Sequence, residues 1–296
     1  MYIHTLSMNI HDYILNINDF ITSDKIHQFI QSLDNPSVQY IKTDFIKQRN
    51  GFMVHINGWR GRNECIDLNS VEILVTGHSD YSVDPSELPI LNLPTLKYWF
   101  CANKNVEHPK LHSMPLGITN KDEPVTRGRH KIIGNTDRIY QIAQNPPAYK
   151  PTKLAYLNIC VTNYTYERER IMVLFANKRW VTHEVPEITE SGHHNFLSKV
   201  HDHKFTISPR GNGLDTHRLW ESLYLGTIPI VKKHLSMKDF EDLPILFVDE
   251  WTDVTEEFLN EQYDLMMKKT YNMKKITMTY WCDKICDLIK EYNLKK

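Results

Sequence analysis

The amino-acid sequence predicts an α/β fold with two domains. From about residue 151 onward, short runs rich in β-branched and aromatic residues alternate with helical patterns, which is typical of parallel βαβ units. The chain has 296 residues, enough for two domains of about 150 residues each. Pro146, Pro147 and Pro151 break both helices and strands, so residues 135–151 are the best candidate for a linker. We therefore expect one domain over residues 1–150 and another from residue 151 onward.

The elements of the C-terminal half are the most clearly marked. Strands are predicted at residues 154–161, 180–182, 204–208, 228–231 and 247–248. Helices are predicted at residues 167–176 and 193–200 and from residue 215 or 216 to Gly226, and most of residues 255–296 is expected to be helical. In the first of these helices, Ile171, Leu174 and Phe175 stand on a charged background, which indicates an amphipathic helix.

The N-terminal half is less regular. Strand candidates lie at residues 51–56, 71–76, 96–102 and 113–116, and turn-forming residues follow several of them. These runs are compatible with a second α/β domain.

Composition excludes several classes of protein. The formal net charge is -1, so the chain as a whole has no basic field with which to bind nucleic acid. The N-terminus lacks the charged and apolar regions of a signal peptide, and no apolar stretch has the length of a membrane span. The 5 cysteines are odd in number and scattered, which favours reduced thiols. We therefore expect a soluble cytoplasmic protein.

The most informative passage runs from residue 204 to residue 231. It is predicted to contain a strand, a loop with Gly211 and Gly213, a helix and another strand. Asp215 or Thr216 can cap the helix by accepting hydrogen bonds from its free N–H groups. Gly226 can end the helix in a left-handed conformation.

This passage is expected to bind a ligand, because open α/β sheets bind ligands beyond the carboxyl ends of their strands. The glycines allow close backbone approach, the helix N-terminus carries partial positive charge, and Arg210 and Arg218 offer bidentate contacts to phosphate. A pyrophosphate is the expected ligand. Glu221 shares a helix face with Arg218 and can accept hydrogen bonds from two ribose hydroxyls. The alternative is an ordinary surface helix in which Glu221 is merely paired with Arg218.

The same residues resemble a pattern of the exostosin-like glycosyltransferases. In that family, a strand that ends in Pro-x-Gly leads to Arg-x-x-Glu and then to Gly-x-x-Pro-Val. The present sequence has, in the same order, Pro209-Arg210-Gly211, Arg218, Glu221, Leu223, Gly226 and Pro229-Ile230-Val231. Ile230 departs from the pattern. The resemblance is close over residues 204–231 and looser over residues 154–176 and 96–118. Length and composition are similar to short soluble members encoded by large DNA viruses, including xylosyltransferases, which implies the host cytoplasm.

The resemblance implies the GT-B architecture, in which two Rossmann-like domains face a central cleft. It implies an inverting transfer from a nucleotide-sugar without a required metal or other cofactor. The donor domain would cover residues 151–278, and a helix over residues 279–296 would pack back on the N-terminal domain. Arg210 and Arg218 would hold the diphosphate, and Glu221 the ribose. The residues expected to bind the donor are Asn163, Arg168, Ser208, Arg210, Gly211, Asn212, Gly213, His217, Arg218 and Glu221.

An inverting transfer needs a base that takes the proton of the acceptor hydroxyl as the nucleotide leaves. In the GT-B architecture this base comes from the N-terminal domain. Asp80 is our first candidate and His78 our second, because both lie in a loop after the apolar strand candidate at residues 71–76. The alternative is that both residues stabilise a turn.

Other interpretations remain open at this point. We expect a UDP-sugar, with xylose as the first candidate, and a hydroxyl of a glycan as the acceptor, but a GDP-sugar is also compatible. A non-catalytic module that binds a nucleotide-sugar or glycan is a second hypothesis. A metal-dependent phosphohydrolase around His201, Asp202 and His203 is a third, although the spacing matches no familiar metal motif. Trp59 and the pair Trp99-Phe100 could form a sugar-stacking surface. The oligomeric state is not predicted.

Overall fold

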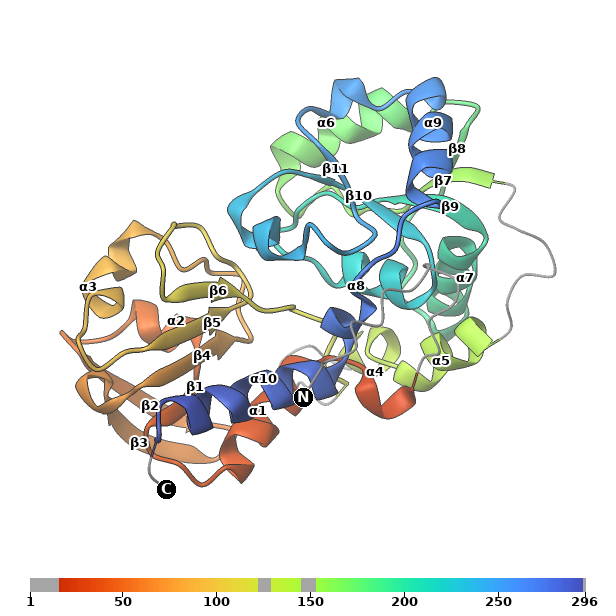
Figure 1. Ribbon diagram of the computed structural model, residues 1–296. Helices are drawn as coiled ribbons and strands as arrows, with labels where there is room; N and C mark the ends of the chain where they lie inside the picture. Colours follow the sequence, from red (N-terminus) through yellow and green to blue (C-terminus); the bar gives the residue numbers. More distant parts are fainter. Residues whose placement is uncertain (1–15, 122–128, 145–152, 295–296) are drawn as a thin grey trace.

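The computed structural model describes residues 16–121, 129–144 and 153–294. Within these ranges the chain forms a mixed α/β structure with two parallel sheets and one antiparallel hairpin. Figure 1 shows the two sheets in separate lobes, with the N-terminal sheet at the left and the C-terminal sheet at the upper right.

The N-terminal sheet is parallel and has the strand order β1-β4-β5-β6. Its strands are β1 (Val38–Lys42), β4 (Ile73–Gly77), β5 (Tyr98–Cys101) and β6 (Leu111–Ser113). The central strand β4 is buried along its whole length. Ile73 and Val75 face one apolar core and Leu74 faces another, as expected when successive side chains of a strand point to opposite sides. The hairpin of β2 (Met53–Trp59) and β3 (Arg62–Asp67) packs on the Leu74 side.

The C-terminal sheet is also parallel, with the strand order β11-β10-β9-β7-β8. Its strands are β7 (Lys153–Leu157), β8 (Val181–His183), β9 (His203–Ile207), β10 (Ile228–Lys232) and β11 (Leu246–Val248). The chain passes from β7 to β8 on one side and then returns to place β9 on the other side of β7. The strand order therefore reverses between β7 and β9.

Helices connect and cover the strands. They are α1 (Ser23–Ser32), α2 (Thr43–Lys47), α3 (Leu88–Leu91), α4 (Arg129–Ile133), α5 (Thr136–Gln144), α6 (Thr165–Phe175), α7 (Glu190–His201), α8 (His217–Tyr224), α9 (Glu256–Met266) and α10 (Met278–Glu291). The 3-10 segments are η1 (Ile17–Asp19), η2 (Leu68–Ser70), η3 (Pro85–Glu87), η5 (Leu235–Phe240), η6 (Trp251–Asp253) and η7 (Met273–Ile276). None of the helices in the described ranges is long and apolar enough to cross a membrane.

The strands and helices predicted in the C-terminal half are all present, with ends displaced by a few residues. Of the two predictions about the ends of α8, the one for its C-terminal end is confirmed and the one for its N-terminal end is wrong. Gly226 has φ of 71°, the left-handed conformation that ends a helix, as predicted. The N-cap is Thr216, whose side chain makes no cap bond, and Asp215 instead accepts hydrogen bonds from the Trp220 indole. The prediction that one of these side chains caps the helix is therefore wrong.

The predicted linker is wrong over residues 136–144, which form α5. Ile139 is fully buried, and Tyr140 and Ala143 pack on the same core, so the apolar spacing of this segment is that of an amphipathic helix. The prolines after it lie outside the described residues. In the N-terminal half, the sequence analysis also missed α1 and β1, although Ile26 and Ile30 of α1 have the spacing of one helix face.

The last helix, α10, lies along α1 and beside the N-terminal sheet (Figure 1). Its Trp281 packs edge-on against Phe100 of β5, with ring centroids 6.0 Å apart. The ammonium of Lys284 lies 5.4 Å from the centroid of the same Phe100 ring. The C-terminal end of the described chain is thus anchored on the N-terminal half.

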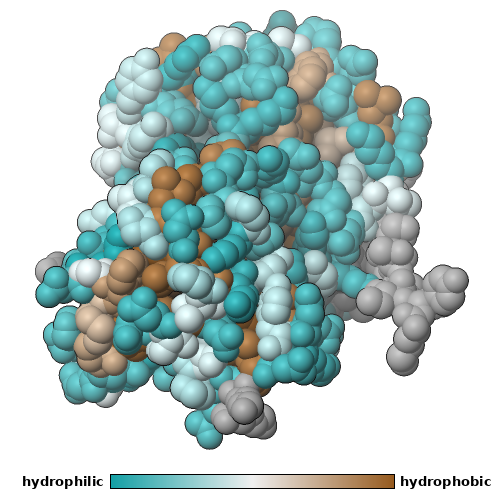
Figure 2. Space-filling model, turned by 60° about the vertical axis from the view of Figure 1, so that its left-hand side comes forward, coloured by the Kyte–Doolittle hydropathy of each residue, from teal (hydrophilic) through white to brown (hydrophobic). Residues whose placement is uncertain are grey.

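Buried hydrogen bonds join the two halves. The hydroxyl of Tyr224 in α8 accepts from the Ile21 N–H at 2.9 Å and donates to the Ile276 carbonyl at 2.8 Å. The Ser236 hydroxyl donates to the Ala102 carbonyl at 2.8 Å. One apolar core also runs through both halves. The face in Figure 2 is mostly hydrophilic, with hydrophobic residues in small patches, as expected when most large apolar side chains are buried.

Candidate functional site

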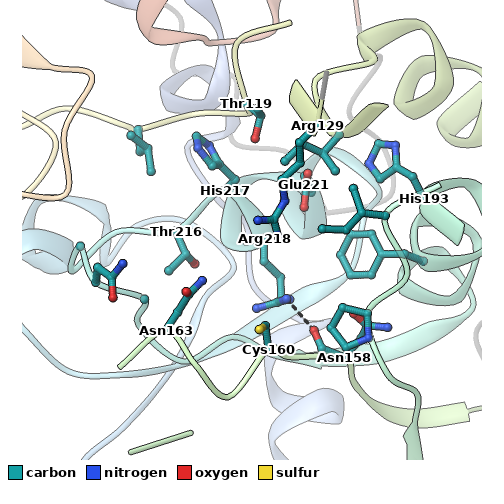
Figure 3. Close-up of a pocket in the computed structure, with 18 of the residues that line it drawn as sticks. Thr119, Arg129, Asn158, Cys160, Asn163, His193, Thr216, His217, Arg218 and Glu221 are labelled. Carbon is teal, nitrogen blue, oxygen red and sulfur yellow. Dashed lines mark hydrogen bonds between the residues drawn. The ribbon is translucent and has the colours of Figure 1, made fainter. Parts of the chain in front are cut away.

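A cavity of about 290 Å³ opens between the two halves. It lies at the carboxyl ends of β7 and β9, where the strand order of the C-terminal sheet reverses. In open α/β sheets this switch point is where ligands bind. Asp80, Leu116 and Thr119 line the cavity from the N-terminal half, and residues of α8 line it from the C-terminal half. Figure 3 shows Thr119 together with His217, Arg218 and Glu221 of that helix. Its volume is close to the lower end, about 300 Å³, of the range for small-molecule sites.

The N-terminal end of α8 faces the cavity, because Thr216 and His217 both line it. The ring of His217 is fixed by a hydrogen bond from Nδ1 to the Gly117 carbonyl, at 2.7 Å. Gly213 lies in the loop ahead of the helix, where a Cβ atom would come within 3.2 Å of the Asn103 amide and 3.4 Å of the Asp80 Cα. Glycine at 213 thus allows this loop to approach the N-terminal half closely.

Arg218 is held at the centre of the cavity. Its Nη2 donates to the Asn158 carbonyl at 2.5 Å, and its guanidinium lies 5.8 Å from the Phe196 ring centroid. The Nε atom is buried and has no hydrogen-bond partner among the described residues. Burial lowers the pKa of Arg218. A guanidinium whose buried Nε has no partner among the described residues is suited to bind an anion.

Glu221 lies one helical turn after Arg218 and lines the same cavity (Figure 3). The residue is 5% exposed, and no described group donates a hydrogen bond to its carboxylate. Burial raises the pKa of Glu221 to about 7, while the charge of Arg218 acts in the opposite direction. Its oxygens are not among the fully buried side-chain atoms that lack a partner, so they are open to the cavity and can accept hydrogen bonds from a molecule bound there.

Asp215 is a second buried carboxylate beside the cavity, but its hydrogen bonds are satisfied. It accepts from the Trp220 indole at 2.9 Å, from the Thr216 N–H at 2.7 Å and from the Leu116 N–H at 2.8 Å. Burial raises its pKa to about 7, against the effect of these hydrogen bonds. Because Leu116 belongs to the N-terminal half, Asp215 joins the two walls of the cavity.

Arg168 of α6 ties together the loops that follow β7 and β9. Its Nε donates to the Arg210 carbonyl and its Nη1 to the Cys160 carbonyl, each at 2.9 Å. Burial, and then the nearby charge of Arg218, lower the pKa of Arg168 to about 10. The guanidinium stays positive at neutral pH, so it adds positive charge while it holds the loops in place.

Most of the residues predicted to bind a donor line this cavity. They are Asn163, Arg168, Gly211, Asn212, Gly213, His217, Arg218 and Glu221. Ser208 and Arg210 are not among the lining residues. Ser208 is buried, and its hydroxyl has no partner among the described residues. Arg210 donates to the Gly211 and Asn212 carbonyls, and its guanidinium lies 4.0 Å from the Tyr164 ring centroid. In this structure Arg210 braces its own loop and does not line the cavity, so its predicted contact with a donor stays a prediction.

The two candidate bases occupy different environments. Asp80 is exposed and lines the cavity. His78 does not line it, and only 3% of its side chain is exposed. Its Nε2 lies 2.5 Å from the Asp24 carboxylate and its Nδ1 lies 2.6 Å from the Tyr40 hydroxyl, so both ring nitrogens have partners. Of the two, only Asp80 is free to meet a ligand in this geometry.

Some lining residues were missed by the sequence analysis. They are Leu116, Thr119, Arg129, Ile133, Asn158, Cys160, Pro186, Glu187, Ile188, His193, Phe196, Asp215 and Thr216. Asn158 and Cys160 lie just after β7 but inside the strand predicted at residues 154–161, so the misplaced strand end concealed their position beyond the sheet. Nothing in the local sequence singles out Phe196 or His193. Burial and the charge of Arg138 lower the pKa of His193 to about 4.

His203, Trp99 and Phe100, which the sequence analysis considered for other roles, are buried. His203 is fully buried between the Lys199 carbonyl, 2.5 Å from Nδ1, and the Thr182 hydroxyl, 2.7 Å from Nε2. The part of the chain that the structure describes contains no cluster of three or more His, Cys, Asp or Glu residues able to hold a metal ion. Trp99 and Phe100 are fully buried, so the hypothesis that they form a sugar-stacking surface is wrong.

Comparison of the chain with models of known protein families and with curated proteins gave no match. Its function is therefore inferred from the residues of the cavity.

Proposed function

We propose that the chain is a glycosyltransferase that binds a nucleotide-sugar in this cavity and transfers the sugar, with inversion, to a hydroxyl of a glycan. In this proposal the two lobes correspond to the two Rossmann-like domains of the GT-B architecture. The location of the cavity, at the switch point of the C-terminal sheet and open to the N-terminal half, supports the proposal.

The diphosphate would lie between the N-terminus of α8 and the guanidinium of Arg218. Free N–H groups of the first helical turn and the helix dipole favour an anion there. The unpartnered Nε of Arg218 supplies a charged donor, and Arg168 adds positive charge from α6. Arg210, which the resemblance assigns to the diphosphate, is turned to its own loop and is left out of this role.

The observation that carries the proposal is the buried carboxylate of Glu221, to which no described group donates a hydrogen bond. Two vicinal ribose hydroxyls would each donate one hydrogen bond to its two oxygens. Arg218 and Glu221 lie on one helix face one turn apart, so a ribose and its neighbouring phosphate would each meet one of the two side chains.

Asp80 is the proposed base. It would accept the proton of the acceptor hydroxyl while the acceptor oxygen bonds to the anomeric carbon and the bond from that carbon to the diphosphate oxygen breaks. Its position on the N-terminal side of the cavity supports this role, because the base of the GT-B architecture comes from the N-terminal domain. His78 is a less suitable base, since both of its ring nitrogens have partners.

UDP-xylose is the first donor to test, and GDP-sugars are the second. The residues near the expected diphosphate and ribose contact parts that both donors share. A module that binds a nucleotide-sugar without catalysis is the remaining alternative. The Asp80→Asn variant distinguishes an enzyme from such a module. In an enzyme, the substitution should abolish sugar transfer and leave the affinity for the nucleotide nearly unchanged.

The proposal is tested by thermal unfolding and calorimetric titration in EDTA, with UDP, GDP and their sugar derivatives as probes. A nucleotide that binds only the folded protein raises its stability. Arg218→Ala and Glu221→Ala should each weaken binding by about 1.5–3 kcal/mol, which is roughly tenfold to more than 100-fold in Kd.

Arg170→Ala and Glu169→Ala are matched controls, because both side chains are exposed on α6. They should leave binding unchanged. If no nucleotide raises the unfolding temperature, or if the two cavity variants bind as tightly as the controls, the assignment of this cavity to a nucleotide-sugar is wrong.

A further inference from the structure

The cavity contains a thiol that the proposed transfer does not use. Cys160 follows β7 and lines the cavity, and Figure 3 shows its sulfur near the guanidinium end of Arg218. The residue is partly exposed. A small molecule that enters the cavity can therefore reach this sulfur.

Neighbouring groups favour the thiolate form of Cys160. The Sγ atom lies 3.0 Å from the hydroxyl of Thr162, which can donate a hydrogen bond to a thiolate. This contact, a backbone hydrogen bond at Thr162 and the charges of Arg168 and Arg129 hold the pKa of the Cys160 thiol below its usual range, although burial acts in the opposite direction. Arg218 is also close enough for the charge of this sulfur to affect it. The thiolate is the nucleophilic form of cysteine.

The other cysteines lack this combination. Cys101 is fully buried, and burial raises its pKa. Cys282 is partly exposed on α10, where burial raises its pKa to about 11. Cys286 is partly exposed on the same helix, and Cys65 is exposed on β3. None of these cysteines lines the cavity.

A second feature indicates that a polar molecule enters beside Cys160. Glu221, 5% exposed, lines the same cavity with no hydrogen-bond donor from the described residues, and the buried Nε of Arg218 likewise lacks a partner. Such groups are normally satisfied. The cavity can thus admit a polar molecule, and Arg168 and Arg218 are close enough for their charges and that of the sulfur to interact.

We propose that Cys160 is a thiol-modification site that reacts with small anionic disulfides such as oxidised glutathione. The Cys160 thiolate attacks one sulfur of the disulfide, a bond forms between the two sulfurs, and the original disulfide bond breaks. One glutathione thiolate leaves, so Cys160 is oxidised and one half of the reagent is reduced. The attached glutathione fills the cavity beside Arg218 and blocks it. A reducing thiol reverses the reaction.

The test is a time course with oxidised glutathione at pH 7, followed by peptide mass spectrometry that quantifies the mixed disulfide at each cysteine of the folded protein. We expect Cys160 to react severalfold faster than Cys65, although Cys65 is the more exposed. Thr162→Val should slow the reaction at Cys160 and leave the rate at Cys65 unchanged, because it removes only the hydroxyl near the sulfur. Cys160→Ser should remove the fast phase.

Because Thr162 is exposed, we expect the Thr162→Val variant to fold like the parent chain. Thermal unfolding of the variant would check this. Modification of Cys65 or Cys286 at the same rate as Cys160, or an unchanged rate in a folded Thr162→Val variant, would overturn the proposal. The measurement requires no nucleotide, so its result is independent of whether the cavity binds a nucleotide-sugar.

Discussion

The carboxylate of Glu221 makes the stability of the protein depend on pH in a direction that can be worked out. Its pKa is raised from 4.5 to about 7 by burial, so the folded state holds this proton more tightly than the unfolded state. Stability is then highest below pH 4.5 as far as this group is concerned, and it falls as the pH rises towards 7. Above about pH 7 the Glu221 carboxylate is charged in the folded protein, and its burial then lowers the free energy of unfolding by the full amount.

The size of the effect follows from the two pKa values. The difference of about 2.5 between them, at 1.36 kcal/mol for each pKa unit, corresponds to about 3 kcal/mol. Glu221→Gln removes this cost at pH 8, and the pKa of about 7 from which the cost is worked out already includes the opposing effect of the Arg218 charge. We therefore expect the variant to be more stable than the parent by about 1–3 kcal/mol at pH 8 and to differ little from it at pH 5.

The assay is urea unfolding at pH 5, 6, 7 and 8, followed by tryptophan fluorescence, for the parent chain, Glu221→Gln and the exposed control Glu169→Gln. Asp215 also has a pKa raised to about 7, but its contribution is the same in all three proteins and cancels in the differences. The reasoning fails if Glu221→Gln and the parent lose stability equally between pH 5 and pH 8. It also fails if the exposed control behaves like the cavity variant.

Two further predictions concern the junction between the halves. Tyr224→Phe leaves the Ile21 N–H and the Ile276 carbonyl without their buried partner. Urea unfolding should therefore show that the free energy of unfolding falls by about 1–3 kcal/mol. An unchanged midpoint would mean that water replaces the hydroxyl. Trp281→Ala opens a cavity against Phe100 under α10 and should cost about 3–5 kcal/mol in the same assay; a loss below about 1 kcal/mol would show that α10 contributes little to folding.

The sequence by itself predicted the order of elements in the C-terminal half, and most of the residues that it singled out for donor binding line the cavity. Local signals were sufficient there. Pro209 follows the end of β9, Gly226 ends α8 with a positive φ, and the apolar runs between them have the lengths of buried strands and a helix. Because such signals depend on neighbours along the chain, they can be recognised before the fold is known.

Only the tertiary structure decided which side chains face the cavity. Arg210 and Arg218 are equivalent in the sequence, yet Arg210 stacks on Tyr164 and Arg218 points into the cavity beneath Phe196. Asp80 and His78 are also neighbours, but one lines the cavity and the other is enclosed by Asp24 and Tyr40. A side chain's direction depends on contacts with segments far away in the chain.

The dependence on contacts with distant segments also explains why the sequence analysis missed helix α5 and did not settle whether Trp99 and Phe100 are buried. A short amphipathic pattern next to prolines, or two aromatics in a strand, can face solvent or core, and the surrounding elements decide which. The cavity itself joins Asp80 to the loop of Gly213 across more than a hundred residues of chain. Local patterns determine the elements, whereas the packing of distant elements determines the environment of each functional group.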